Sequence, residues 1–170
     1  MRTNLLAFLV LASACDPEVG SLAECAPVAA GATIDDTVPP IVDADLQGWL
    51  ASASYVAYLP ESAAHPSAGP HGGSVRTFVN RALAGSLGTC ATSHPVGAAA
   101  VKELHGDAGL RGWAVMVKTR PAAGAASWYW YEVFDTAPGA TPAFSGQGDD
   151  TCTGCHDGGL DAIRTAWPLG

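Results

Sequence analysis

The residues with the clearest chemical signature lie near the carboxyl terminus, where the chain reads Cys152-Thr153-Gly154-Cys155-His156. In c-type haem attachment, two thiols add to the vinyl groups of the porphyrin, and the imidazole of the next residue binds the iron. The C-x-x-C-H spacing supplies all three groups within one turn of chain. The sequence therefore predicts one covalently attached haem c, bonded through Cys152 and Cys155, with His156 as the axial ligand of the iron.

Two other kinds of site use part of this spacing. A thioredoxin-like redox pair needs one C-x-x-C, and a zinc site usually needs two. The chain has no second C-x-x-C, and the motif does not open a helix after a first strand. Both alternatives therefore fit less well than haem.

The chemistry of such a haem would depend on the group opposite the axial histidine. Met116 is the only methionine after the first residue, so an electron carrier with His/Met ligation would have to use it. A methionine in mid-strand more often fills a core. The remaining candidates are four histidines, none with a spacing that recommends it: His65, His71, His94 and His105.

A lysine among small apolar residues is the second chemical candidate. Strand alternation over residues 98–105 places Lys102 on the same side as Ala100 and Leu104, with Glu103 on the other side. Desolvation lowers the pKa of a lysine and makes its amine nucleophilic. The alternative is an edge-strand lysine whose ammonium reaches water.

The amino terminus has the pattern of a secretory signal peptide. Arg2 precedes a short apolar run, residues 5–11, and then the small residues 12–14. The run is well under the roughly 20 residues needed to span a bilayer. We therefore expect residues 1–14 to be a signal peptide and the mature protein to be exported.

Cys15 follows the leader directly, as the lipid-modified cysteine of a lipobox does. The match is imperfect, because Ala12 stands where leucine is usual. We expect a lipid on Cys15 as the only membrane attachment, and ordinary cleavage near Ala14 is the alternative. The first outcome gives a membrane-anchored lipoprotein, and the second gives a soluble periplasmic protein.

The five cysteines also suggest a disulfide. If Cys15 carries lipid and the motif carries haem, Cys25 and Cys90 remain, and an oxidising compartment favours their pairing. Two separate buried thiols are the alternative.

The net charge of -8, without any cluster of Lys or Arg, disfavours nucleic acid as a partner.

The hydrophobic pattern predicts a tether or irregular arm over residues 15–42 and one domain over residues 43–170. A helix should begin at Asp43, which can cap it, and residues 61–73 should form a loop. Four stretches have strand character: residues 75–80, 98–105, 112–119 and 127–134.

Connections between these stretches set the fold class. Residues 81–87 can form a short helix, and the last three strands have short connections, which favours an antiparallel meander. Beyond the motif, apolar residues 160, 163 and 167 have helical spacing. The sequence therefore predicts an α+β fold: an antiparallel β-sheet of about four to five strands with flanking helices, and a C-terminal haem-binding helix that the motif opens.

In this order the segments resemble the cytochrome P-460 and cytochrome c-prime-beta family. The matching segments are residues 75–80, 95–97, 101–104, 115–118, 128–131 and 152–156. The resemblance implies an antiparallel sheet over the distal face of a five-coordinate haem, often in a homodimer. It also implies an open iron site for small nitrogen ligands such as hydroxylamine or nitric oxide, and a periplasmic redox partner.

The resemblance further assigns individual residues. In P-460 members the lysine of the Val-Lys-Glu stretch is bonded to the porphyrin, and that position is Lys102 here. Arg76 matches a family arginine that would belong to the distal pocket, with a surface ion pair as the alternative. Hydroxylamine-oxidising members place a proton-accepting carboxylate where this chain has Ala114. Oxidation should therefore be weak unless Glu103, Glu132 or another group substitutes.

These observations leave three hypotheses. The first is a P-460-type monohaem cytochrome that binds or oxidises small nitrogen species. The second is a non-catalytic gas-binding cytochrome of the c-prime-beta kind, without the lysine crosslink. The third is a simple electron-transfer cytochrome with Met116 as the sixth ligand.

Overall fold

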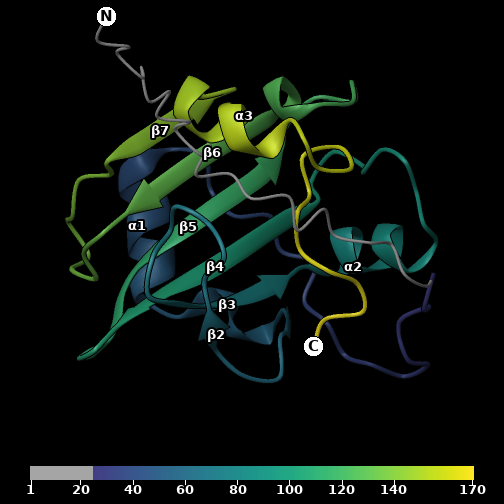
Figure 1. Cartoon of the computed structure of the whole chain (residues 1–170), viewed down its shortest axis with the longest axis horizontal. Helices are drawn as coiled ribbons and strands as arrows, with labels where there is room; N and C mark the ends of the chain where they lie inside the picture. Colours follow the sequence, from purple (N-terminus) through teal and green to yellow (C-terminus); the bar gives the residue numbers. More distant parts are fainter. Residues whose placement is uncertain (1–24) are drawn as a thin grey trace, which may run out of the picture.

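The computed structural model describes residues 25–170 (Figure 1). The expected signal peptide, residues 1–14, and the expected lipid attachment site, Cys15, lie outside the described residues. Within residues 25–170, no helix combines the length and the apolar character that a membrane crossing requires.

The described chain folds around one antiparallel sheet. Its strands are β1 (Leu59–Pro60), β2 (His65–Pro66), β3 (Ser74–Val79), β4 (Ala99–Gly106), β5 (Gly109–Lys118), β6 (Trp128–Val133) and β7 (Phe144–Gln147). The helices are α1 (Asp43–Ala51), α2 (Arg81–Gly88) and α3 (Asp150–His156), with 3-10 turns η1 (Ser54–Ala57) and η2 (Ala125–Ser127). The strand order is β1-β3-β4-β5-β6-β7, and β2 pairs with β3. This is the expected α+β class, although the sheet has seven strands in the described chain instead of four or five.

The long strands β3 to β6 correspond to the four stretches expected from the sequence. β4, β5 and β6 form the expected meander, and only Asp107 and Ala108 join β4 to β5. Gly109 closes this turn at a φ of 106°, a conformation that a residue with a Cβ atom avoids. The strands that the sequence did not reveal, β1, β2 and β7, have only two to four residues, too few to show an alternation.

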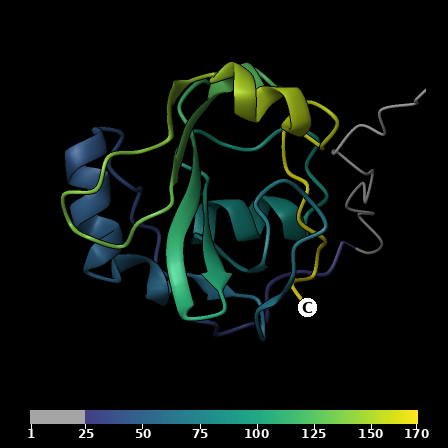
Figure 2. The same cartoon turned by 60° about the vertical axis from the view of Figure 1, so that its left-hand side comes forward.

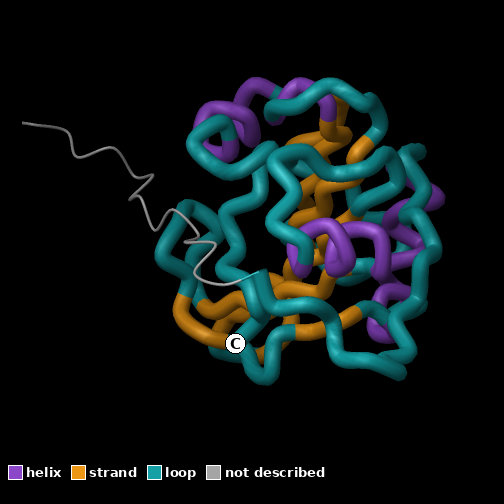
Figure 3. The backbone as a smooth tube through the Cα atoms, turned by 90° about the vertical axis from the view of Figure 1, so that its right-hand side faces the viewer, coloured by secondary structure: helices purple, strands orange, loops and turns teal. Residues whose placement is uncertain are grey.

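Different layers cover the two faces of the sheet. α1 packs on one face, where Leu46 and Leu50 join a cluster that includes Tyr131. α2 and the carboxyl-terminal segment lie on the other face, where Leu83 and Trp167 belong to a second cluster. Figure 2 shows α1 and α2 on opposite sides of the sheet. Figure 3 shows that loops make up much of the layer on the α2 side.

The starts of α1 and α2 are fixed in different ways. Asn80 caps α2, because its Oδ1 accepts hydrogen bonds from the N–H groups of Leu83 and, in β4, of Ala99. Asp43 does not cap α1, contrary to expectation; it is the first helical residue. Its carboxylate accepts a hydrogen bond from the hydroxyl of Tyr129 in β6 instead, which ties α1 to the sheet.

The described part of the expected tether packs against the domain. Ile34 is 4% exposed and belongs to the core on the α2 side. The carbonyl oxygen of Ala26 accepts a hydrogen bond from Trp167 at 2.8 Å. Cys25 and Cys90, the pair expected from the sequence, form a disulfide with their Cα atoms 5.2 Å apart. Residues 25–42 are therefore an irregular arm packed against the domain and not a free tether, because apolar residues without periodicity still find partners in the folded chain.

The helix that the motif was expected to open is not confirmed. α3 contains the whole motif and ends at His156, and residues 160–167 form no helix. Asp161 and Ala162 have φ values of 45° and 71°, which is the left-handed region and turns the chain sharply. The apolar residues of this segment fill the core from an irregular backbone, so their helical spacing does not reflect a helix.

Replacing both Cys25 and Cys90 by serine should lower the free energy of unfolding by about 2–4 kcal/mol, because the unfolded chain then regains the freedom of a long loop. Urea unfolding of the full chain measures this difference. Thr89→Ala, an exposed neighbour of the disulfide, is the control and should change stability by about 0.5 kcal/mol or less. An unchanged urea midpoint in the double serine variant would contradict the expectation.

Candidate functional site

A cavity of about 1240 Å³ lies on the α2 side of the sheet. The strands β3 to β6 form one wall, and the loop of residues 61–71 forms another. Side chains of α3 and of the segment after it complete the lining. The cavity exceeds the roughly 300–1,000 Å³ of common small-molecule pockets, so it has room for a large planar ligand.

The sheet wall of the cavity consists of two rows of side chains that run across the strands. Antiparallel pairing places residues of neighbouring strands directly opposite one another, so the side chains of one row all lie on the same face of the sheet. Both rows lie on the face that borders the cavity. The first row is Thr77, Lys102, Ala114 and Glu132. The second row is Val79, Ala100, Met116 and Trp130. Charged and polar groups are thus confined to one row, and the other is apolar.

Lys102 occupies the position that strand alternation predicted, on the same face as Ala100. β4 is an interior strand, so the alternative of an edge-strand lysine is wrong. Among the described residues, its ammonium has no hydrogen-bond or ion-pair partner, and the part of the side chain that is not buried faces the cavity. Burial lowers the pKa of Lys102, although the carboxylates of Glu61 and Glu132 oppose this effect. The amine is therefore suited to act as a nucleophile.

His156, at the end of α3, presents its imidazole to the cavity in the form that binds a metal. Its Nδ1 lies 2.8 Å from the carbonyl oxygen of Ala162. A carbonyl can only accept, so Nδ1 carries the proton and Nε2 is left with a lone pair. The ring packs against Trp130, with ring centroids 4.5 Å apart. Burial lowers the pKa of His156 to about 4, so the imidazole is neutral at pH 7.

The two cysteines of the motif both line the cavity. Asp149 caps α3, since its carboxylate accepts hydrogen bonds from the N–H groups of Thr151 and Cys152. Cys152 is a free thiol whose pKa is raised to about 12, first by burial and then by the nearby carboxylates. Cys155 is disulfide-bonded in this structure, so a thioether at Cys155 requires reduction of that disulfide first.

His71, in the loop expected over residues 61–73, belongs to the cavity. His71 Nδ1 lies 2.9 Å from Glu132 Oε1, and both side chains are mostly buried. Arg111 donates a hydrogen bond to the carbonyl oxygen of His71 and holds its loop against the sheet. Glu132 lies directly opposite Ala114 across β5 and β6, so the cavity has a carboxylate beside the position where the family pattern lacks one. No spacing in the sequence could have paired residues so far apart.

Other expected site residues lie outside the cavity. Arg76 is wrong as a distal residue: it lies on the α1 face, where its Nε donates to the carbonyl oxygen of Glu61 and its guanidinium stacks over Phe78. Glu103 also faces that side and accepts a hydrogen bond from Tyr55. His105 pairs with Glu103 at 3.1 Å. Strand alternation turns Glu103 and His105 away from Lys102 within β4. Arg76 stands opposite Glu103 in the register of β3 and β4, so it faces the same way.

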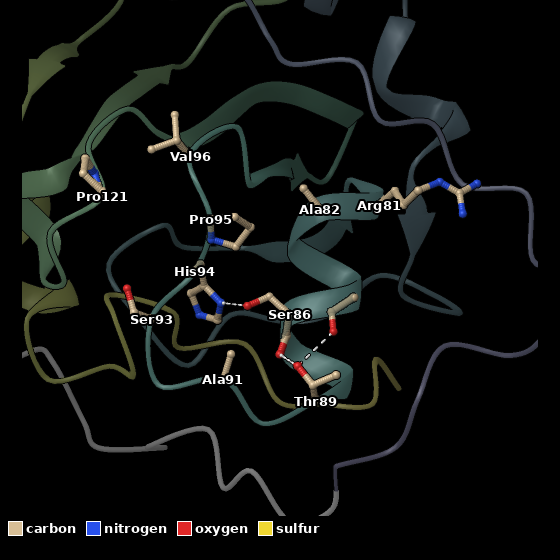
Figure 4. Close-up of a pocket in the computed structure, with 11 residues that line it drawn as sticks. Arg81, Ala82, Ser86, Thr89, Ala91, Ser93, His94, Pro95, Val96 and Pro121 are labelled. Atoms are coloured by element: carbon tan, nitrogen blue, oxygen red, sulfur yellow. Dashed lines mark hydrogen bonds between the residues drawn. The ribbon is translucent and has the colours of Figure 1, made fainter.

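A second, shallower pocket of about 650 Å³ lies beside α2 (Figure 4). It contains His94, whose Nδ1 lies 2.8 Å from the hydroxyl oxygen of Ser86. A catalytic serine–histidine pair needs a group that orients the ring. Asp161 accepts its hydrogen bond from the backbone N–H of His94 and not from the ring. The pair of His94 and Ser86 therefore lacks the third member of a triad. His94 also does not line the main cavity, so it is not placed as an iron ligand there.

Comparison with known proteins gives no match: no family model, no curated protein and no solved structure is similar to this chain at a significant level. The family resemblance therefore depends on the sequence segments alone. Within residues 25–170, no group of three or more His, Cys, Asp or Glu side chains is placed to hold a bare metal ion.

The burial of Lys102 predicts a pH-dependent stability. In the full chain produced without haem, Lys102→Met should raise the free energy of unfolding at pH 7, because methionine brings no charge to desolvate. The folded pKa of Lys102 lies below its unfolded value of about 10.4, so between these values the unfolded state binds more protons and wild-type stability rises with pH.

Urea unfolding at pH 7 and at pH 10 tests both parts of this prediction. The advantage of the methionine variant should shrink at the higher pH. A wild type that is more stable than the variant at pH 7 would contradict the assignment of Lys102 as a desolvated amine.

Proposed function

We propose that this protein is an exported monohaem c-type cytochrome of the P-460 kind, whose iron has an open side that binds or oxidises small nitrogen species such as hydroxylamine or nitric oxide. One observation carries the proposal: Lys102 and the Cys152–His156 motif line the same cavity. They are far apart in the sequence, and the resemblance assigns both to one haem. Electrons from an oxidised ligand would pass to a periplasmic redox partner.

The residues around the cavity fit a haem. Cys152 and Cys155 would form the thioethers, and His156 would bind the iron through Nε2, the nitrogen that bears a lone pair. The neutral imidazole needs no deprotonation before it binds. Apolar side chains line much of the remaining wall, as a porphyrin requires: Val75, Val79, Leu83, Met116, Ile163 and Trp167. Haem iron would supply a binding position for a small ligand and accept electrons from it.

Lys102 would supply the nitrogen for a bond to the porphyrin, a replacement of ring hydrogen that would also need an external two-electron oxidant. Its amine has no competing partner among the described residues, and burial favours the neutral, nucleophilic form. Because β4 is an interior strand, the Lys102 side chain projects from one face of the sheet, and that face borders the cavity. This supports a crosslink at Lys102 over the uncrosslinked gas-binding alternative.

Proton transfer would fall to Glu132. Hydroxylamine must lose protons as it is oxidised, and Ala114 cannot accept them. Glu132 is the cavity-facing carboxylate nearest to that position in the sheet, because it lies opposite Ala114 in the register. His71, at 2.9 Å, can share the proton and orient the carboxylate. Glu103 cannot substitute, because it lies on the other face.

One observation favours the alternative function, a simple electron-transfer cytochrome. Met116 lines the cavity, so its thioether sulfur is on the same side of the sheet as a bound haem would be. Ligation by Met116 would fill the sixth position and give a low-spin spectrum. A five-coordinate iron would give a high-spin spectrum, so the two functions are distinguished by absorption alone.

The full chain matured in a host that assembles c-type cytochromes should gain the mass of one haem, which stays bound after acid denaturation. Replacing Cys152 and Cys155 by serine should abolish this covalent haem. Lys102→Ala should convert a strongly red-shifted ferrous Soret band into an ordinary high-spin band. A colourless wild-type protein with the mass of the bare polypeptide would overturn the proposed function.

Glu132→Gln should lower the rate of hydroxylamine oxidation by about 100-fold or more, because the amide cannot accept a proton. Steady-state turnover with an artificial electron acceptor measures this loss. Glu103→Gln is the matched control on the opposite face and should retain the wild-type rate. Equal losses in the two variants would count against Glu132 as the proton acceptor, provided that both keep full haem content.

A further inference from the structure

We propose that the buried ion pair of Lys118 and Asp161 is a positioning device that sets the orientation and the donor strength of His156, the axial ligand in the proposed function. The proposal rests on that function for its consequences at the iron. Its structural part concerns only residues of the chain itself. Neither Lys118 nor Asp161 lines the cavity, so both would act through other groups.

Lys118 ends β5 and lies entirely inside the protein. Its Nζ is 2.7 Å from both carboxylate oxygens of Asp161, and both side chains are 0% exposed. It also donates to the hydroxyl of Ser127 and to the carbonyl oxygen of Ala122. A buried lysine with all its protons engaged holds its partners in one arrangement, because any shift leaves an unpaired charge. The end of the sheet is therefore joined rigidly to the turn after α3.

The carboxylate of Asp161 also has several hydrogen-bond partners. Besides Lys118, its carboxylate accepts hydrogen bonds from the N–H groups of His94 and Gly124, each at 2.7 Å. Burial by itself would raise the pKa of Asp161, but these bonds outweigh it and the pKa lies below its ordinary value. The carboxylate thus stays charged and ties three separate segments to the turn.

The turn needs this attachment because its backbone is unfavourable. Asp161 and Ala162 are successive residues with positive φ and neither is glycine. Such a conformation persists only where surrounding contacts fix it. The carboxylate of Asp161 supplies these contacts on one side, and the burial of Ala162 in the core supplies them on the other.

The contacts of this turn fix the position of the backbone carbonyl group of Ala162. The oxygen of Ala162 lies 2.8 Å from His156 Nδ1 and thereby determines the tautomer and the rotation of the ring. A hydrogen bond of this kind increases the basicity of a metal-binding histidine. Lys118 and Asp161 are thus positioning residues for the iron, although they contact neither the ligand nor the cavity.

The test compares three variants of the matured holoprotein. The double variant Lys118→Met with Asp161→Asn removes the pair without leaving a lone buried charge, and Ser127→Ala weakens the pair without changing charge. Val117→Ala is the control: it neighbours Lys118 but is buried in the cluster on the other face. The readouts are the iron–histidine stretching frequency of the ferrous haem and the reduction potential.

We expect a lower iron–histidine frequency and a more positive potential in the double variant, with smaller shifts of the same sign in Ser127→Ala. Val117→Ala should lose stability and keep both wild-type values. Wild-type values in the double variant, or equal shifts in the control, would overturn the proposal. A merely structural role for the ion pair would change stability in all three variants and the frequency in none.

A second measurement keeps the proposal testable if a variant matures poorly. Nitrogen-15 NMR of the His156 ring in the full chain without haem should find the proton on Nδ1 in the wild type. Ser127→Ala and the double variant should show a growing fraction with the proton on Nε2. A wild-type ring protonated on Nε2 would overturn the proposal. Because this readout needs no haem, its failure is separate from a failure of the proposed function.

Discussion

The structure depends on the antiparallel register of β3 to β6. In that register Lys102, Ala114 and Glu132 stand opposite one another and face the same cavity. A slip of one residue in any of these pairings would turn a whole strand over and send its charged side chain into the α1 layer. The tight turn between β4 and β5 and the apolar core under α1 fix the register, so the packing of one face determines the chemistry of the other.

The two faces of the sheet are used differently. Under α1, large buried side chains such as Tyr55, Trp113 and Tyr131 fill the space. On the other face, small residues such as Ala100 and Ala114 leave room, and loops form much of the cover. Polar groups that border this room are then only partly solvated, which is why the lysine there has a lowered pKa and the histidine is neutral. Burial at the border of this cavity thus shifts both side chains toward their neutral forms.

Several parts of the fold could be predicted from local patterns. Residues 75–134 contain strong alternation and turn signals, and the four long strands and α2 follow them closely. Alternation also assigned Lys102 and Glu103 to opposite faces. The short strands carry no such pattern, and the spacing of apolar residues after the motif suggested a helix that does not exist. There the backbone is set by the buried pair of Lys118 and Asp161, which is a contact between distant segments.

The sequence by itself determined the local chemistry: the C-x-x-C-H spacing and a lysine on an apolar strand face. These depend on neighbours within a few residues, where bond geometry and strand period suffice. Only the tertiary structure decided that His71 meets Glu132, that Arg76 lies outside the cavity, and that a carbonyl group orients His156. Such meetings depend on how strands pair and loops close over long separations, and no short-range period encodes them.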